Sequence, residues 1–215
     1  MNDQDLMEED YLLLVRETQV DIDPLVERAR FDPEFRDLVV QQLVSHKHIN
    51  VYFHSYRIMQ QVTAADPVGC LRYWDDFVGL LQHPNSYHRN YGMDLLPDLL
   101  PMDLRKRFDV AFPDYYKQLH DEKISTRKYC ISYSERIIRH RPDLTNRIVG
   151  EIIASLRMNE NSKSHQNFLL WAFLELVVLC RVSPATNLEL YAFLQEVLAT
   201  TIPPRVRREI GKLMV

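Results

Sequence analysis

Two stretches decide the fold of this chain: LLQHPNSYHR (80–89) and QLHDEKISTR (118–127). Each has a leucine at its second position and an arginine at its last, and the two stretches lie 38 residues apart. Leucines that end amphipathic stretches recur along the chain at Leu43, Leu81, Leu119, Leu156 and Leu198. Self-similarity at a period of about 38 residues is typical of stacked helix-pair repeats. We therefore interpret these histidine-containing stretches as repeated architecture.

The composition favours helix throughout. The chain of 215 residues contains only 5 glycines, and 46% of its residues are hydrophobic. Few glycines disfavour tight β-turns, and a hydrophobic content of this size can build a core. We expect an all-α protein.

Each repeat unit reads as two helices joined by a short polar turn. CLRYWDDFVGLLQ (70–82) places apolar residues at i, i+3 and i+4, and HPNS (83–86) separates it from YHRNYGMDLLPDLL (87–100). A single helix pair cannot bury its apolar face, so we predict one domain, 1–215, built from stacked pairs. An acidic cap, 1–32, with a helix around 10–20, precedes the predicted units 33–70, 71–105, 106–143, 144–184 and 185–215.

The two stretches resemble the turn inside HEAT repeats, which runs from a leucine through an Asp-Pro-type turn to an arginine. The second unit has His83 at the aspartate position and Arg89 at the arginine position, and the third unit has Asp121 and Arg127. The resemblance implies a right-handed α-solenoid (an α-α superhelix) of about five stacked HEAT-like helix pairs.

The same resemblance implies a structural ladder. The guanidinium of each arginine would bond to an acceptor in the turn of its own or the neighbouring unit, through Asp121, Arg127 and Arg89. A small residue follows each arginine by three positions, Gly92 in one unit and Cys130 in the next. Such helices are expected to pack closely at these positions.

The formal charge is −4, and it is unevenly distributed along the chain. Residues 1–37 carry −8, residues 38–135 are neutral and residues 136–215 carry +4. Binding to a nucleic acid needs clustered Lys and Arg, so we expect none. The basic third keeps a nucleic-acid-binding or DNA-alkylation-repair-like HEAT protein as an alternative.

Three widely spaced cysteines lack disulfide or zinc spacing, and the N-terminus is acidic and polar. The longest apolar run, 168–180, is too short for a bilayer and contains Glu175. We expect a cytoplasmic protein that does not enter a membrane.

Neither a catalytic nor a metal site is predicted. Histidines gather near the turns, at His46, His48, His54, His83, His88 and His120, but without the HExxH spacing of zinc enzymes. Trp74 beside Asp75 or Asp76 invites comparison with HEAT-like DNA glycosylases, yet its spacing from Leu71 and Phe77 favours the core. The cationic segment 135–143 could hold a phosphate or an acidic peptide, but it also suits a helix C-terminus. We expect no enzyme activity and no cofactor.

The predicted function is a scaffold or interaction module that binds a protein or peptide on the concave face formed by the second helices. The exposed positions expected on this face are Tyr52, Tyr56, Gln60, Asn90, Asp94, Asp98, Lys128, Ser132, Glu135 and Arg139. A mixed-charge surface with tyrosines suits a protein partner. A lyase- or chaperone-like helper of a partner protein remains an alternative.

The ends of the array are expected to carry opposite charge and to allow weak self-association. At the front, Leu12, Leu13 and Val15 are predicted to face the stack while the acids face water. At the back, Val206, Ile210 and Leu213 are predicted to point inward.

Overall fold

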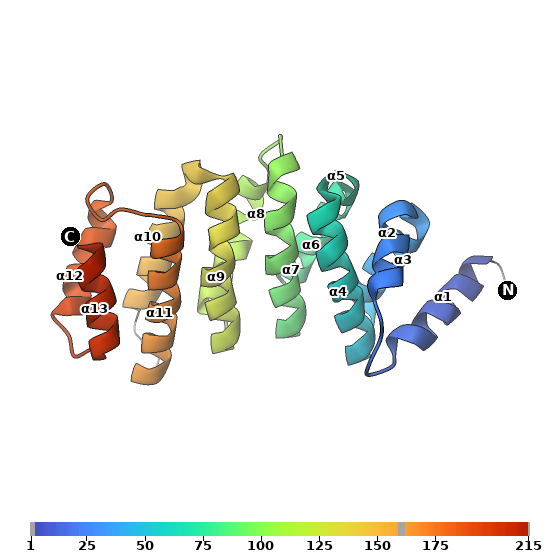
Figure 1. Ribbon diagram of the computed structural model, residues 1–215, viewed down its shortest axis with the longest axis horizontal. Helices are drawn as coiled ribbons and strands as arrows, with labels where there is room; N and C mark the ends of the chain where they lie inside the picture. Colours follow the sequence, from blue (N-terminus) through green and yellow to red (C-terminus); the bar gives the residue numbers. More distant parts are fainter. Residues whose placement is uncertain (1–2, 159–161, 215) are drawn as a thin grey trace. The chain divides into compact units, whose positions relative to one another are not determined.

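The computed structural model describes residues 3–158 and 162–214, and within these ranges the chain is all α, with no strand (Figure 1). The chain forms two compact units, unit 1 (Met1–Asp109) and unit 2 (Val110–Val215). Because each unit is compact by itself, one continuous core through residues 1–215 remains a prediction.

Unit 1 contains a series of helices joined by short turns. They are α1 (Asp3–Val15), α2 (Asp23–Phe31), α3 (Pro33–Ser45), α4 (Ile49–Ala65), α5 (Pro67–Cys70), η1 (Leu71–Tyr73), α6 (Trp74–Leu80), α7 (Ser86–Leu99), η2 (Leu100–Met102) and the start of α8 (Arg107–Tyr116).

Unit 2 continues the same plan after the first residues of α8. Its further helices are η3 (Lys117–His120), α9 (Ile124–His140), η4 (Pro142–Leu144), α10 (Thr145–Arg157), α11 (Lys163–Leu179), α12 (Leu188–Leu198) and α13 (Pro204–Leu213).

The helices expected from the repeat pattern are present as pairs. α3 and α4, α6 and α7, α8 and α9, α10 and α11, and α12 and α13 occupy the five predicted segments. The single acidic helix predicted around 10–20 is wrong: α1 ends at Val15 and a second helix, α2, begins at Asp23. Pro24 lies in the first turn of α2, where its fixed backbone angle starts a helix but cannot continue one.

Short polar side chains explain where several helices begin. The Asp32 carboxylate accepts hydrogen bonds from the backbone N–H groups of Glu34 and Phe35, and Pro33 follows it at the first helical position. Asn85 accepts from the N–H of Tyr87 at the start of α7. These side chains satisfy backbone donors that have no partner within a helix, so they separate consecutive helices sharply.

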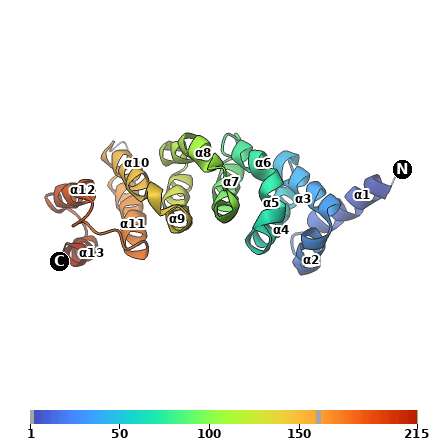
Figure 2. The ribbon, with the colours of Figure 1, turned by 90° about the horizontal axis from the view of Figure 1, so that it is seen from above.

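Each unit has two layers of helices. In unit 1, α4 packs on α3, and α7 packs on both α6 and α4. In unit 2, α9, α11 and α13 lie on one side and α8, α10 and α12 on the other, as the view from above shows (Figure 2). We call the layer that contains α4 and α7, or α9, α11 and α13, the second-helix layer of its unit.

The periodic leucines mark the core in part. Leu43, Leu81 and Leu119 are buried, whereas Leu156 and Leu198 are only half-buried. The leucine period therefore predicts core residues well in the first three units and less well in the last two.

The small residues that follow the two arginines are confirmed as points of close packing. A Cβ atom on Gly92 would lie 2.7 Å from the Phe77 carbonyl oxygen, so only glycine lets α7 approach α6 this closely. Cys130 is fully buried, and its thiol donates to the Tyr115 carbonyl oxygen at 3.6 Å.

Trp74 is 3% exposed, which confirms that it belongs to the core. The Arg107 guanidinium lies over its ring, 4.6 Å from the centroid. Its indole is therefore covered on both the core side and the solvent side, and it offers no surface for an extruded base.

The predicted inward residues of the terminal helices are partly correct. Val15 is fully buried and Leu12 is half-buried, but Leu13 is 68% exposed; Tyr11, which was not predicted to face inward, is buried. The hydroxyl groups of Tyr11 and Ser55 are 2.7 Å apart, which fixes the rotation of α1 against α4. At the other end, Val206 and Ile210 are buried as predicted, and Leu213 is half-buried.

Among the described residues, no helix has both the length and the apolar composition needed to cross a bilayer. Helix α11, which contains most of the apolar run 168–180, has 17 residues.

Candidate functional site

The same kind of arginine contact occurs in each of the two turns that carry the repeat motif. Arg89 donates from Nη1 to the main-chain oxygens of His83 and Pro84, both at 2.8 Å. Arg127 donates from Nε to the main-chain oxygen of Asp121 at 2.5 Å. In each case an arginine in the first turn of a second helix bonds to the carbonyl six residues earlier.

In both turns the arginine bonds to a backbone carbonyl, which is an acceptor in the turn of its own unit, as the ladder prediction expects. His83 stands at the aspartate position of the second unit, and its carbonyl oxygen accepts there as that of Asp121 does in the third unit. A turn that ends one helix leaves carbonyl groups without intrahelical partners, and a guanidinium can satisfy two of them at once.

Removing either arginine is expected to destabilise the protein. Arg127→Ala and Arg89→Ala should each lower the free energy of unfolding by about 1–2 kcal/mol, because half-buried carbonyl groups lose charged donors. Urea unfolding followed by circular dichroism measures this change. Lys117→Ala, an exposed cation on η3, is the control and should change stability by less than about 0.5 kcal/mol. An unchanged midpoint for both arginine variants would show that the contact is incidental.

Three residues expected to be exposed in unit 1 are buried instead. Tyr52, Tyr56 and Asp94 are 5%, 8% and 4% exposed, so the prediction that they form an open binding face is wrong. The physical reason is that α4 and α7 pack directly against each other, which turns these positions toward the neighbouring helix. Side chains that an isolated helix would expose become part of the contact between two second helices.

The buried residues form a polar network. The Tyr56 hydroxyl donates to Asp94 Oδ2 at 2.6 Å, and Gln60 Nε2 donates to the same oxygen at 2.6 Å. Gln60 also donates to the Tyr56 hydroxyl oxygen at 2.9 Å. The ring of Tyr56 stacks on that of Tyr91, with centroids 3.9 Å apart and planes 9° apart. Asp94 thus accepts two strong hydrogen bonds inside the α4–α7 contact.

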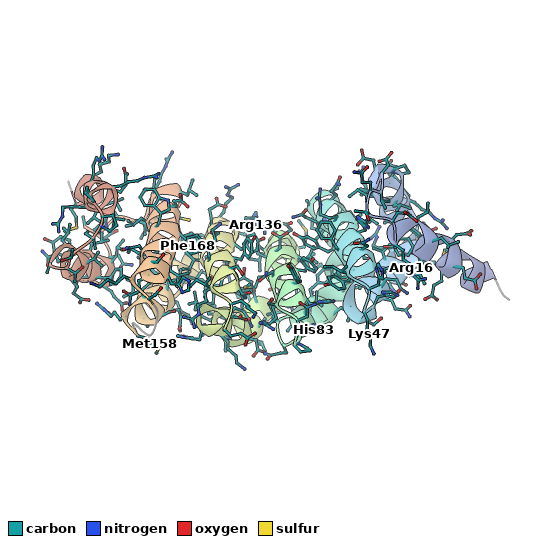
Figure 3. All side chains as sticks on the ribbon, turned by 90° about the horizontal axis from the view of Figure 1, so that it is seen from below. Arg16, Lys47, His83, Arg136, Met158 and Phe168 are labelled. Atoms are coloured by element: carbon teal, nitrogen blue, oxygen red, sulfur yellow. The ribbon has the colours of Figure 1, made fainter. Side chains whose placement is uncertain are left out.

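An aromatic cluster continues from this network toward the turn. The rings of His83 and His88 stack with centroids 4.0 Å apart, and the ring of His88 lies 4.4 Å from that of Tyr52. Figure 3 shows His83 at the turn between α6 and α7. His88 is 2% exposed, and neither of its ring nitrogens makes a hydrogen bond of good geometry with the described residues.

The environment of His88 favours the neutral ring. Burial is the largest cause and the neighbouring His83 adds to it, so the pKa of His88 is lowered to about 4, although the Leu43 backbone acts in the opposite direction. The imidazole of His88 stacks on His83 and lies at 53° to the Tyr52 ring, so it serves as a flat apolar group. We therefore assign this cluster a structural role.

The remaining predicted residues of unit 1 are half-buried. They are Gln60, Asn90 and Asp98. Gln60 belongs to the network around Asp94, and none of the three side chains is fully exposed.

In unit 2 the predicted residues are more accessible. Lys128, Ser132 and Glu135 are half-buried and Arg139 is exposed, and their spacing of i, i+4, i+7 and i+11 puts them on one side of α9. The Arg139 guanidinium pairs with the Glu135 carboxylate. The charges of Glu135 and Arg139 also act on the thiol of Cys180, whose pKa is raised to about 11 mainly by burial. Because Cys180 follows α11, this side of α9 faces α11.

The sequence reasoning missed the residues on α11 that lie beside this row. Phe168 is 46% exposed and Leu179 is 67% exposed. Trp171 is half-buried, and its Nε1 donates to Glu175 at 2.6 Å. The apolar run 168–180 suggested a fully buried helix. The signal that could have revealed an exposed stripe is the i, i+3, i+7 and i+11 spacing of residues 168, 171, 175 and 179, which places them on one side of the helix.

Helix α13 completes this surface. The Arg205 guanidinium lies over the Trp171 ring, 4.0 Å from its centroid. Arg208 and Lys212 follow Arg205 at i+3 and i+7 and are exposed. We define the second-helix face of unit 2 as Lys128, Ser132, Glu135, Arg136 and Arg139 on α9, Phe168, Trp171, Glu175, Val178 and Leu179 on α11, and Arg205, Arg208 and Lys212 on α13. Figure 3 shows Arg136 and Phe168 on this side of unit 2.

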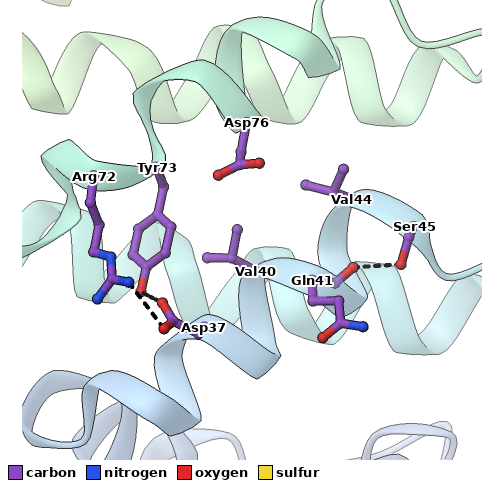
Figure 4. A pocket seen from close by; sticks show the side chains of 8 residues that line it. All are labelled: Asp37, Val40, Gln41, Val44, Ser45, Arg72, Tyr73 and Asp76. Atoms are coloured by element: carbon purple, nitrogen blue, oxygen red, sulfur yellow. Dashed lines mark hydrogen bonds and ion pairs between the residues drawn. The ribbon is translucent and has the colours of Figure 1, made fainter.

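A different pocket lies in unit 1, between α3 and the η1–α6 segment, with a volume of about 410 Å³. The Tyr73 hydroxyl donates to Asp37 Oδ1 at 2.5 Å, and Arg72 donates to Oδ2 of the same carboxylate at 3.2 Å (Figure 4). The pKa of Asp76 is raised, first by burial and then by the charges of Asp75 and Asp37. This pocket contains none of the predicted partner-binding residues, and its Asp37 is already hydrogen-bonded.

Within residues 3–158 and 162–214, no group of three or more His, Cys, Asp or Glu side chains could hold a metal ion. In the same ranges Cys70, Cys130 and Cys180 are free thiols. Comparison of the chain with protein-family models, curated protein sequences and solved structures gave no significant match.

Proposed function

We propose that this chain is a HEAT-like α-solenoid that acts as a non-catalytic protein-interaction module and binds its partner on the second-helix face of unit 2. The observation that carries this proposal is the composition of that face. Large apolar side chains on α11 are exposed, and cations on α9 and α13 flank them. Exposed apolar surface rimmed by polar residues is characteristic of a binding surface.

The repeated plan of the helix pairs supports the solenoid part of the proposal. The arginine-to-carbonyl contact is the same at the turns of Arg89 and Arg127, with the same spacing of six residues. Stacked repeats reuse one local contact in successive units because each unit solves the same folding problem. A measurement of the molecular envelope by small-angle scattering tests this part directly.

The face of unit 2 is favoured over unit 1 because the corresponding positions in unit 1 are used internally. Tyr52, Tyr56 and Asp94 are buried between α4 and α7, whereas Phe168, Val178 and Leu179 are at least 46% exposed. Aromatic and arginine side chains, which this face combines, are also enriched at the energetic centres of protein interfaces.

Site-specific photo-crosslinking in the native cell tests the proposal. A photoreactive amino acid at Phe168 should crosslink to one or a few proteins. The same group at Ala154, an exposed position on α10 in the opposite layer of unit 2, is the matched control. Equal products at both positions, or none at Phe168, would contradict the assignment of this face.

A further inference from the structure

We propose that the partner presents an acidic amphipathic helix, which lies along α11 between the cationic side chains of α9 and α13. This inference rests on the proposed function and adds the chemical class of the ligand.

The apolar part of the face has the shape of a stripe. Phe168, Trp171 and Leu179 repeat at i, i+3 and i+11 on one side of a helix of 17 residues. Val178 extends the stripe and is 53% exposed. A partner helix places apolar residues at i, i+3, i+4 and i+7 in the same way, so two such stripes can interdigitate along their length.

The cations lie on both sides of this stripe. Helices α9 and α13 each pack against α11, and packed helices are about 8–10 Å apart. Lys128 and Arg136 on α9 therefore flank a helix bound over α11, with Arg205 and Arg208 of α13 on the other side. A helix with carboxylates on both edges of its apolar stripe would pair with both sets, and this arrangement is specific to an amphipathic acidic segment.

Several of these cations are held in place before a partner arrives. The Arg205 guanidinium lies 4.0 Å from the centroid of Trp171, and the Arg136 guanidinium lies 5.1 Å from that of Tyr133. The Lys128 ammonium lies 5.4 Å from the centroid of Tyr129. The Arg205 guanidinium, stacked on the Trp171 ring, can still present N–H groups at its edge to a carboxylate, and a fixed side chain loses less entropy on binding.

The acids on the same face argue against a phosphate backbone or an anionic membrane as the ligand. Glu135 pairs with Arg139, and Glu175 accepts from the Trp171 indole N–H at 2.6 Å. Unit 2 carries 15 basic and 11 acidic residues, a modest excess. A uniformly anionic surface would meet these carboxylates, whereas a folded peptide can place a donor or a neutral side chain opposite each one.

A designed peptide tests the inference on the full chain. The probe has 17 residues, matching the length of α11, with leucines at i, i+3, i+4 and i+7 and glutamates on both flanks. Fluorescence polarisation of the labelled peptide gives its Kd. The matched control replaces every glutamate with lysine. We expect the acidic peptide to bind at least ~10-fold more tightly than the lysine peptide at low ionic strength.

The location of binding can be read from Trp171. The chain has two tryptophans, so Trp74→Phe leaves Trp171 as the sole indole reporter. The acidic peptide should shift its emission. Lys128→Glu and Arg205→Glu should each weaken binding at least ~5-fold. Lys117→Glu, the same charge change at an exposed site on η3 outside the second-helix face, should not weaken binding. Thermal unfolding verifies that every variant is folded.

Two sets of results overturn the inference. The first is equal binding of the lysine peptide, or no binding of the acidic one. The second is tighter binding of duplex DNA, or of phosphatidylcholine vesicles containing phosphatidylserine, at the same ionic strength. If the acidic peptide fails while Phe168 still crosslinks selectively, the chemistry assigned to the partner is wrong and the interaction module stands. If both fail, the proposed function fails as well.

Discussion

Replacing Asp94 with alanine is expected to lower the free energy of unfolding by about 3 kcal/mol, because the buried Tyr56 hydroxyl and the half-buried Gln60 amide lose their shared acceptor. The Tyr56 hydroxyl and Gln60 Nε2 both donate to Asp94 Oδ2 at 2.6 Å, and Asp94 is 4% exposed. A buried donor that loses its partner keeps the full cost of its desolvation. Urea unfolding at neutral pH measures the change.

Two further variants make this result specific to the network. Tyr56→Phe removes one donor and leaves Gln60 bound to Asp94, so it should cost roughly half as much, about 1–2 kcal/mol. Asp75→Ala removes an exposed carboxylate in the first turn of α6 and should cost less than about 1 kcal/mol. A stability for Asp94→Ala within about 0.5 kcal/mol of the wild-type value would show that the buried network does not hold α4 against α7.

His88 is expected to make the protein less stable as the pH falls from about 6.5 to about 4. Its pKa in the folded protein is lowered to about 4, chiefly by burial, whereas an unfolded histidine has a pKa of about 6.5. Between these two values the unfolded chain binds a proton that the native state excludes, so the native state loses stability as the pH falls. A separation of this size corresponds to about 3 kcal/mol over the whole interval.

The variant His88→Phe tests this pH dependence. Phenylalanine keeps a flat ring between His83 and Tyr52 but cannot bind a proton. The difference in unfolding free energy between the variant and the wild type should therefore grow in favour of the variant by about 3 kcal/mol between pH 7 and pH 4. Carboxylates common to both proteins cancel in this difference.

A second histidine provides the control for that experiment. His120 is exposed, so His120→Gln should leave the difference from the wild type the same at both pH values. A constant difference for His88→Phe as well would mean that the folded protein protonates His88 without cost.

If the second-helix face of unit 2 binds an acidic helix, its affinity should respond to salt while the stability of the α4–α7 contact should not. Exposed cations such as Arg208 are screened within about 8–10 Å at physiological ionic strength. The hydrogen bonds to Asp94 are buried, and screening acts on them far less. The second-helix face of unit 2 is therefore expected to depend on salt, whereas the buried α4–α7 contact of unit 1 is not, although both are formed by second helices of the repeat.

The sequence by itself determined the helices and their pairing. The period of about 38 residues and the i, i+3, i+4 spacing predicted the helix pairs from α3 to α13, because local periodicity records which side of each helix meets its partner. Gly92 was also readable, since only a residue without a side chain allows the closest approach of α7 to α6. Trp74 was assigned correctly to the core from its spacing alone.

Only the tertiary structure decided which side of each second helix remains open to solvent. Tyr56 and Lys128 occupy comparable exposed positions on the helix pattern, yet Tyr56 is buried against α7 whereas Lys128 is half-exposed beside α11. Helical periodicity gives the direction of a side chain from its own axis, but burial also depends on how closely the next helix approaches. That approach depends on contacts between residues about 40 positions apart, such as Tyr56 with Asp94, and these do not follow from the pattern of either helix alone.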